Sequence, residues 1–513
     1  MITTQRRYLV RRVAASTLVA AAIAFGLVRA FAGGFTQPPP DGAAAFVPRG
    51  ALVYLNLHTD RGGGEWKRAT AALGKLPAFS QLRDLLVRQA TTGTLGGLTF
   101  QRDVRPWLGD EAAFAELPEG KLLVLQPRKE RAAQAALVRV SHSTERYRGL
   151  ALHDLGGGDV AIVVGGYALL GQRAAVRAAL DAAATKGASL ASDKTYEDLR
   201  GGLPQSRVVT GYVSAQWIRA HLSGPAGLLS AAAQAPSIQA AAISFGAASK
   251  RLEVALRGRT GPGRSACTGQ GDGSTMLATA PARPALFLGL ENAQCLVRDL
   301  MALPRSGIGK ALRTLAVAAQ RSGINLGTQL LPLLKGDTAL TITPGQAAPT
   351  FTLDVAGAKA AQGIGLLGRL QPVLAGLLSR DSQGEAPGFA TSRVAGVNVL
   401  TAQLTPALQL SYAAFNGHLL LSNSVRGIAA VRNGHHLDDS SDFKTVLRDR
   451  PNHPSALVFL DLEKLLALAD QAGLGSNPIY SAFRDDLQKI GAAGAVLTRE
   501  GNDIDAELRL KNP

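Results

Sequence analysis

The sequence predicts an α+β protein with two duplicated domains, each a mainly antiparallel sheet with helices on one face, preceded by one N-terminal hydrophobic helix. Three observations support this fold class. Short apolar strands adjoin one another with helices inserted at intervals, whereas a parallel doubly wound sheet, the alternative, needs stricter alternation of strand and helix. Similar segments recur in the same order in both halves of the chain, and one apolar run follows a cluster of arginines at the N-terminus.

Within the first half, local patterns predict an ordered series of strands and helices. The segment 52–57 is apolar and is bounded by Pro48 and Gly62, which is typical of a short strand. Leucines at 82, 85 and 86 have helical spacing. The glycine pair at 165–166 indicates a hairpin turn. We therefore expect strands at 52–57, from 112 and at 121–126, helices at 79–89, 128–141 and 174–184, and a hairpin formed by 160–166 and 168–171.

The second half repeats features of the first at a spacing of about 230 to 250 residues, which indicates an internal duplication. Any one match is weak, but five occur in the same order. The paired segments are 48–55 with 281–288, 106–113 with 332–339, 166–170 with 417–421, 192–196 with 439–443, and 247–257 with 496–508.

The duplication divides the chain into parts with different compositions. We expect a signal-anchor helix at 1–35, a proline-rich exit at 36–44, a first α+β repeat at 45–259, a Gly-rich linker at 260–275 and a second repeat at 276–513. If the repeats share an ancestor, Tyr54 should correspond to Phe287, Gly109 to Gly336, Gly166 to Gly417 and Tyr212 to Phe459.

The N-terminus carries the membrane-directed segment. Four arginines between positions 6 and 12 precede the uncharged run 13–28, an order that predicts a cytoplasmic N-terminus and an extracytoplasmic bulk. The run is slightly short for a bilayer, so a signal peptide cleaved near the small residues 30–32 is the alternative. The protein is thus expected in the cell membrane as a single-pass protein, or secreted if the signal is cleaved.

Composition excludes several functional classes. Hydrophobic residues make up 46% of the 513 residues and charged residues 18%, which excludes wholesale disorder. Aromatic residues make up only 5%, which argues against a nucleic-acid module built on stacking. The net charge of +17 would favour anionic lipid or cell-wall polymers as partners, although a generally solvated basic surface is the simpler interpretation.

Two short patterns resemble a catalytic motif and a cofactor-binding motif, but the sequence around each lacks the features that such motifs require. Ser441 and Lys444 have the spacing of a serine–lysine pair, but the companion motifs are missing and a solvated helix start explains them better. Glycines 363, 365 and 368 match a dinucleotide fingerprint in letters only, because they lie about eight residues beyond the expected strand at 351–355. We therefore expect no catalytic and no cofactor-binding residue.

His435 and His436 precede three aspartates, Asp438, Asp439 and Asp442, which could offer ligands to a divalent ion. Adjacent histidines in an extended loop point apart, so an exposed polar loop is the preferred interpretation and no metal site is expected. The two cysteines exclude a disulfide framework and a multi-cysteine zinc module. Cys267 and Cys295 could form a disulfide in an oxidising compartment, with two unpaired thiols as the alternative.

The order of features resembles an uncharacterised bacterial family, the domain of unknown function DUF3352. The residues that carry the resemblance follow the anchor and are mostly structural: Pro48, Ala51, Tyr54, Trp66, Leu76, Pro77, 106–111 and 189–196. The second repeat keeps the pattern less well, since Leu333 and Leu334 replace Trp107 and Leu108. The resemblance implies a membrane-anchored envelope protein and supplies no catalytic residue.

These observations favour a membrane-anchored extracytoplasmic protein that binds or scaffolds an envelope component without catalysing a reaction. Two alternatives remain: an exported hydrolase with a site built from non-contiguous residues, and a carrier of a lipid or other hydrophobic ligand. The expected partners are the membrane, through the N-terminal helix, and an anionic lipid, cell-wall polymer or envelope protein. No nucleic-acid partner is expected, and the sequence leaves the oligomeric state open.

Overall fold

The structure is a computed structural model in which two compact units can be described separately. One comprises residues up to Gly261 together with Asn502–Asp505 and the C-terminal pair from Asn512, and the other comprises Pro262–Gly501 and Ala506–Lys511. The described residues are 41–58, 64–76, 98–205, 207–222, 238–248, 250–261, 272–302, 307–321, 323–345, 348–357, 362–369, 388–405, 408–433 and 436–512.

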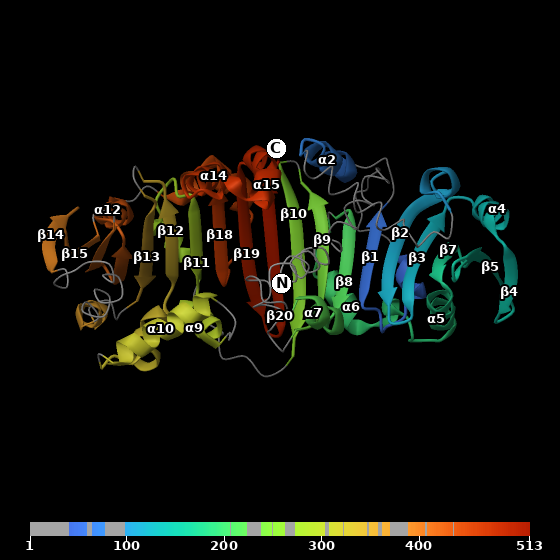
Figure 1. The fold of residues 1–513 in the computed structure, drawn as a ribbon, viewed down its shortest axis with the longest axis horizontal. Helices are drawn as coiled ribbons and strands as arrows, with labels where there is room; N and C mark the ends of the chain where they lie inside the picture. The colour runs from blue at the N-terminus through green and yellow to red at the C-terminus, as the bar shows by residue number, and fades with distance from the viewer. Residues whose placement is uncertain are drawn as a thin grey trace, which may run out of the picture. The chain divides into compact units, whose positions relative to one another are not determined.

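The first unit is built on one sheet of ten strands, and every register described in it is antiparallel. The order across the sheet is β4-β5-β6-β7-β3-β2-β1-β8-β9-β10, and its central strands lie side by side in Figure 1. The strands are β1 (Val53–His58), β2 (Leu108–Leu117), β3 (Gly120–Pro127), β4 (Ser143–Tyr147), β5 (Leu150–Gly156), β6 (Asp159–Val164), β7 (Tyr167–Gln172), β8 (Val209–Ser214), β9 (Ile238–Ala247) and β10 (Arg251–Thr260).

The second unit pairs its strands in the corresponding order, β14-β15-β16-β17-β13-β12-β11-β18-β19-β20. The registers described in it are also antiparallel, so the chain is an α+β protein on antiparallel sheet, as the sequence predicts. The strands are β11 (Leu286–Leu290), β12 (Thr338–Thr343), β13 (Thr350–Ala356), β14 (Phe389–Val394), β15 (Val397–Thr405), β16 (Leu408–Phe415), β17 (His418–Ser422), β18 (Ala456–Asp461), β19 (Ala492–Glu500) and β20 (Asp503–Lys511).

The helices connect these strands. In the first unit they are η1 (Gly42–Phe46), α2 (Gly64–Leu73), η2 (Phe100–Val104), α4 (Glu130–Val140), α5 (Arg173–Ala184), η3 (Leu190–Ser192), α6 (Lys194–Gly201) and α7 (Ala215–Leu222). In the second they are η4 (Thr275–Thr279), α9 (Ala293–Ala302), α10 (Gly307–Arg321), η5 (Leu326–Leu330), η6 (Leu331–Lys335), a helix at 362–369, α12 (Val425–Asn433), η7 (Leu437–Asp439), α13 (Ser441–Leu447), α14 (Leu462–Gln471), η8 (Leu474–Ser476) and α15 (Pro478–Ile490).

Helices cover both faces of the first sheet, so the expectation of helices on one face is wrong. Strand β1 is buried at every position, and successive residues alternate between two cores. Val53, Leu55 and Leu57 pack with α4 and α7, whereas Tyr54 packs with η1, α5 and α6. A strand buried on both sides shows no polar alternation, which is why the sequence pattern did not reveal the second layer.

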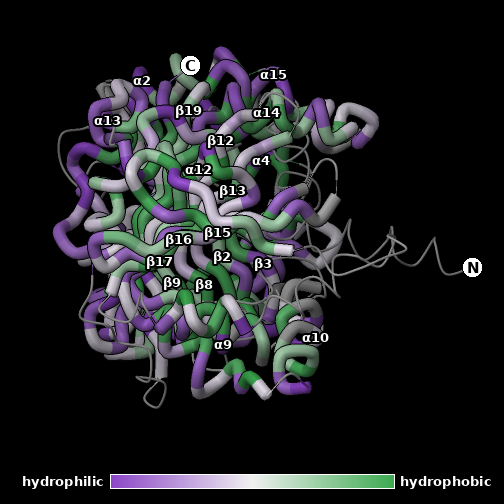
Figure 2. The backbone as a smooth tube through the Cα atoms, turned by 90° about the vertical axis from the view of Figure 1, so that its left-hand side faces the viewer, coloured by the Kyte–Doolittle hydropathy of each residue, from purple (hydrophilic) through white to green (hydrophobic). Residues whose placement is uncertain are grey.

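The second sheet is also covered on both faces. Phe287 packs with η4, η7 and α13, whereas Val355 packs with α10 and the helix at 362–369. Figure 2 shows hydrophobic positions gathered in the interior, with hydrophilic positions common on the outer turns and helices. The hydrophobic residues of each unit therefore form cores on both faces of its sheet.

Most elements that the sequence predicts in the first half are confirmed: the strands β1, β2 and β3, the helices α4 and α5, and the hairpin of β6 and β7. The helix predicted at 79–89 and the anchor predicted at 1–35 lie outside the described residues. In the part of the chain that the structure describes, no helix has the length and apolar character needed to cross a membrane. The hairpin of β4 and β5 was not predicted.

Candidate functional site

The first unit contains a buried group of polar side chains around Asp41, which we name the Asp41 cluster. Asp41 immediately precedes η1 and accepts hydrogen bonds from the hydroxyl groups of Tyr54 and Tyr196, each at 2.5 Å. The Asn56 amide donates to the same carboxylate at 2.8 Å, and Arg200 Nε lies 3.1 Å from it. Strand β1 and helix α6 thus hold the chain segment that enters the unit.

Glu111 is the second carboxylate of the Asp41 cluster and is fully buried. It accepts hydrogen bonds from the Ala43 amide at 3.0 Å, from Asn56 Nδ2 at 2.9 Å and from the Tyr167 hydroxyl at 2.6 Å. Burial raises the pKa of Glu111, while the Tyr167 and Ala43 hydrogen bonds oppose that rise. Asn56 donates to both carboxylates and so links them.

The tyrosines of the Asp41 cluster are also held by ring packing. The rings of Tyr54 and Tyr196 meet edge to face with centroids 5.8 Å apart, and Tyr196 meets Tyr212 in the same way at 5.5 Å. Burial, followed by the charge of Asp41, raises the pKa of Tyr54 and of Tyr196. These hydroxyl groups therefore remain protonated donors at neutral pH.

His58, at the end of β1, is buried and lies opposite Glu111 in the β1–β2 register. Burial lowers its pKa to about 4, and the charges of Arg207 and Arg200 contribute to that lowering. The imidazole is therefore neutral at pH 7. The side chain of Arg207 is held by the carbonyl oxygens of Leu203 and Pro204, at 2.9 and 2.7 Å.

The hydrogen bonds of the Asp41 cluster hold chain segments together and leave its carboxylates poorly suited to catalysis. Each carboxylate accepts at least three hydrogen bonds from the chain itself, and the donors are buried or partly buried. A general base needs a free lone pair within reach of a substrate proton. Satisfied internal acceptors instead stabilise one arrangement of the elements that donate to them.

The second unit has a smaller polar group around Asp337, which precedes β12, and Asp354, in β13. Asp337 accepts from the Asp272 amide at 3.2 Å and from Thr275 Oγ1 at 2.6 Å. Asp354 accepts from Thr279 Oγ1 at 2.8 Å and lies 2.8 Å from His418 Nδ1. The hydrogen bond with Asp354 raises the pKa of His418, against the opposing effect of burial.

The serine–lysine interpretation of Ser441 and Lys444 has no geometric support. Lys444 Nζ reaches the backbone oxygen of Asp439 at 3.4 Å, and the Ser441 carbonyl accepts from Thr445 Oγ1. Ser441 begins α13, whose N-terminus is capped by the Ser440 hydroxyl. The pair serves as the start of a helix.

The structure also places the candidate glycines and the candidate metal ligand Asp442 where they have structural roles. Glycines 363, 365 and 368 lie within the helix at 362–369, away from the strand-to-helix turn that a dinucleotide site requires. Among the described residues, no group of three or more metal-binding side chains comes together. Asp442 instead forms an ion pair with Lys511 at 2.7 Å. Cys295 lies in α9, but Cys267 and His435 lie outside the described residues, so the disulfide stays a prediction.

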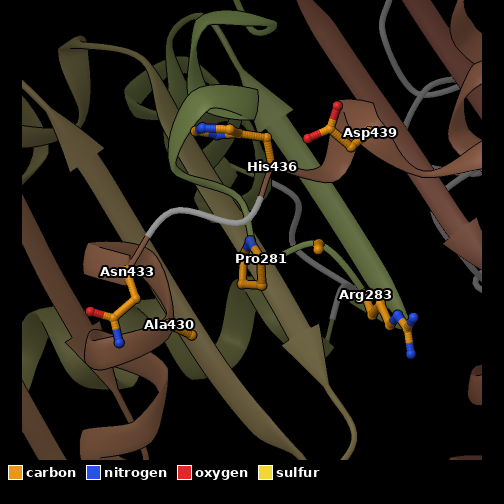
Figure 3. Close-up of a pocket in the computed structure, with 7 residues that line it drawn as sticks. Pro281, Arg283, Ala430, Asn433, His436 and Asp439 are labelled. Atoms are coloured by element: carbon orange, nitrogen blue, oxygen red, sulfur yellow. The ribbon is translucent and has the colours of Figure 1, made fainter.

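A pocket of about 660 Å³ lies in the second unit, between the segment before β11 and the end of α12. Figure 3 shows Ala430 and Asn433 on α12, and Arg283 pointing away from the His436 ring. Its lining residues are Pro281, Ala282, Arg283, Ala430, Asn433, His436 and Asp439. The pocket therefore combines an apolar lining with one guanidinium, one imidazole, one carboxylate and one amide group.

Sequence reasoning missed the Asp41 cluster. Its members come from five separate segments of the chain, which hold Asp41, Tyr54 with Asn56, Glu111, Tyr167, and Tyr196 with Arg200. The sequence patterns singled out Tyr54, Tyr196 and Glu111, the last of these in the turn at 106–111, but only as structural residues. Trp107 in that turn is buried and donates its indole hydrogen to the Asp103 carbonyl. Trp217 is likewise buried in the core of the first unit.

Comparisons with known proteins place the chain in a family without assigning it a role. No curated protein matches it. Crystal form I of TP0453 matches with a TM-score of 0.27 at 11% identity, covering 44% of this chain and 81% of that one. Crystal form III gives 0.24 at 11% identity, with 45% and 82% covered, and neither likeness is close enough to support an inference. The family model "Protein of unknown function (DUF3352)" matches residues 13–510. The chain therefore belongs to the DUF3352 family.

Proposed function

We propose that this chain is a membrane-anchored extracytoplasmic protein whose two related domains bind or scaffold an envelope component without catalysis. The observation that carries the proposal is the Asp41 cluster. It fastens the residue that follows the proline-rich run to strand β1 and helix α6. A helix at 1–35 that anchors the chain would thereby be joined to the first unit by a buried attachment rather than by a free tether.

The non-enzymatic part of the proposal is supported by the state of the buried acids. Asp41 and Glu111 are the acidic side chains at the centre of the most extensive buried polar group described above, and both are occupied by internal donors. The alternative, an exported hydrolase, needs a nucleophile beside a base. Labelling of the purified protein by a serine-hydrolase probe, abolished by Ser441→Ala, would favour that alternative.

The relation between the domains is supported by their registers. Tyr54 lies opposite Tyr212 in the β1–β8 pair, and Phe287 lies opposite Phe459 in the β11–β18 pair. The 3-10 helices η1 and η4 precede β1 and β11 in the same way. We therefore assign 45–259 and 276–513 to two copies of one ancestral domain, with 260–275 between them.

The turn glycines fit the same assignment. A Cβ on Gly109 would meet the Gln126 carbonyl, and one on Gly336 would meet the Ala356 carbonyl at the matching place of the next strand. Gly166 and Gly417 both have a positive φ in the turn before β7 and β17. These constraints act on the backbone, so they persist while side chains change.

Membrane attachment is tested by fractionation. The full-length protein should stay in the membrane pellet after alkaline extraction, and a variant lacking 1–35 should not. A reporter fused after Pro513 should be active only outside the cytoplasm, because the arginines at 6–12 favour a cytoplasmic N-terminus. Cytoplasmic activity would overturn the topology, and mass spectrometry showing loss of the N-terminus from the membrane species would establish cleavage.

A further inference from the structure

One helical layer of the second unit is rich in basic residues. The segment 293–335, which we name the α9–α10 layer, comprises α9, α10, η5 and η6. It contains one acid, Asp299, and six basic residues, which gives a net charge of +5. The basic residues are Arg298, Arg305, Lys310, Arg313, Arg321 and Lys335. α9 lies beside α10 (Figure 1) and contacts η6, and Ala319 of α10 is fully buried in the core that contains Val355.

The helices on the other face of the second sheet have a net charge of the opposite sign. There η7 and α13 pack with Phe287, whereas α10 packs with Val355. In the registers of β11, β12 and β13, Phe287 lies level with Thr352, and an odd number of residues separates Thr352 from Val355, so Phe287 and Val355 project to opposite faces. The segment 437–449, which contains η7 and α13, carries four aspartates and two basic residues. The two helical segments therefore differ in the sign of their net charge.

The exposed side of α10 combines basic and apolar side chains. Four exposed residues follow this side at spacings of three or four: Lys310, Thr314, Val317 and Arg321. Val317 is 53% exposed, and Leu296 on α9 is 41% exposed. Among the residues that the structure describes, neither Lys310 nor Arg321 forms an ion pair with an acid. Basic groups beside exposed apolar side chains are typical of helices that lie on a membrane surface.

We propose that the α9–α10 layer docks on the anionic phospholipid surface of the membrane that holds the chain. The inference rests on the proposed extracytoplasmic anchoring, because a single N-terminal anchor confines the second unit to the vicinity of that surface. The net charge of +5 complements the phosphate groups of anionic lipids. Leu296 and Val317 can enter the boundary between head groups and acyl chains, and the long stems of Lys310 and Arg321 let their charges reach the head groups.

The exposed apolar side chains favour a lipid surface over a soluble anionic polymer. A polymer such as polyphosphate would engage the basic groups alone and would leave Leu296 and Val317 in water. A lipid surface takes up both kinds of group at once. Docking would also orient the second unit, because it would direct the segment 437–449, on the opposite face of the sheet, away from the membrane.

A fluorescent probe at position 317 tests the contact. The full-length protein with Cys267→Ser, Cys295→Ser and Val317→Cys is labelled with the environment-sensitive dye NBD. It is then reconstituted in vesicles of one part phosphatidylglycerol to two parts phosphatidylcholine. The emission should shift to shorter wavelength, and spin-labelled lipid should quench it. Val138→Cys in the same background is the matched control, because Val138 is 55% exposed on α4 of the first unit, and its probe should show neither effect.

Charge reversal separates docking from mere proximity to the membrane. Lys310→Glu combined with Arg321→Glu should remove most of the shift, because each basic residue near an anionic surface favours contact by roughly fivefold. Lys129→Glu combined with Arg131→Glu makes the same change of charge at exposed positions at the start of α4. This control should leave the shift at position 317 unchanged, whereas vesicles of phosphatidylcholine alone should abolish it.

Several results would overturn the docking proposal. They are equal signals at positions 138 and 317, an equal shift in phosphatidylcholine vesicles, and an unchanged shift in the Lys310→Glu, Arg321→Glu variant. A shift that arises only when soluble polyphosphate is added would assign the α9–α10 layer to an anionic polymer and would also overturn it. Flotation of the vesicles reports the anchor separately: flotation without the shift would contradict docking alone, and loss of flotation would contradict both the anchor and docking.

Discussion

At the scale of single residues, the Asp41 cluster is the feature most sensitive to small chemical changes. Tyr196 is 2% exposed, and its hydroxyl has Asp41 as its acceptor. A buried carboxylate that loses a donor keeps its desolvation cost without compensation. Removing one oxygen atom here should therefore cost more than removing it at the surface.

We expect Tyr196→Phe to lower the free energy of unfolding of the first unit by roughly 1–3 kcal/mol. Tyr147→Phe is the matched control, because its hydroxyl donates to Asp181 at 2.8 Å from an exposed strand. The three tryptophans, Trp66, Trp107 and Trp217, all lie in the first unit, so tryptophan fluorescence during urea unfolding reports that unit. Equal effects of the two variants would contradict the role assigned to the Asp41 cluster.

His418 should make the second unit more stable at lower pH. The hydrogen bond with Asp354 raises its folded-state pKa above 6.5, so its stabilising contribution is fully present below the unfolded pKa. That contribution is lost as the pH rises through the folded pKa. Histidine-selective NMR should show one resonance, absent in His418→Gln, that titrates above pH 6.5.

Asp354→Asn supplies the control for this assignment, because it keeps a carbonyl acceptor and removes the charge. The variant should return the His418 pKa toward its ordinary value. Unfolding followed by circular dichroism should show the wild-type protein gaining stability over His418→Gln as the pH falls from 8 to 6. The opposite trend would show that burial, not the carboxylate, governs this histidine.

At the scale of elements, the apolar strands were predictable and the polar hairpin was not. β1 and β3 stand out because apolar residues run along them between turn signals. β4 has the sequence Ser-Thr-Glu-Arg-Tyr, and each of its residues is exposed or only partly buried. Its pairing with β5 supplies the strand structure, and a local pattern of burial cannot reveal such a strand.

Two glycines of the second unit differ in what an added side chain would meet: at one it would collide with a neighbouring strand, and at the other it would only change helix propensity. A Cβ on Gly336 would lie 2.0 Å from the Ala356 carbonyl, a backbone atom that cannot move aside. A Cβ on Gly365, in the helix at 362–369, would meet no heavy atom of another described segment within 4 Å. The same substitution should therefore have opposite signs at the two sites.

We expect Gly336→Ala to destabilise the second unit by roughly 1–3 kcal/mol, because the added carbon forces a shift of the strand pair β12–β13. Gly365→Ala should stabilise it by up to about 1 kcal/mol through helix propensity. Circular dichroism measures both changes. Tryptophan fluorescence, which reports the first unit, should not change, and a neutral Gly336→Ala would mean that this turn is not closely packed.

At the scale of the whole molecule, the α+β fold class could be predicted from the sequence. The helices on the second face of each sheet could not. The strand patterns identified the antiparallel α+β architecture because short apolar strands adjoin one another with helices inserted at intervals. The second helical layer went unrecognised because β1 and β2 are buried on both faces and so lack alternation. The Asp41 cluster could not be predicted because its residues meet only after the sheet has formed.

The two cysteines are expected to form a covalent link between the Gly-rich linker at 260–275 and the start of the second repeat. Cys267 and Cys295 would close a loop of about 28 residues, for which the chain-entropy model gives about 3–4 kcal/mol. We expect thiol titration of the denatured protein without reductant to find no free thiol. Cys295→Ser should expose one thiol at Cys267 and lower the unfolding free energy of the second unit, with reduced wild-type protein as its control. Two free thiols in the untreated protein would end the idea, because an oxidising compartment permits two cysteines that meet in the fold to pair.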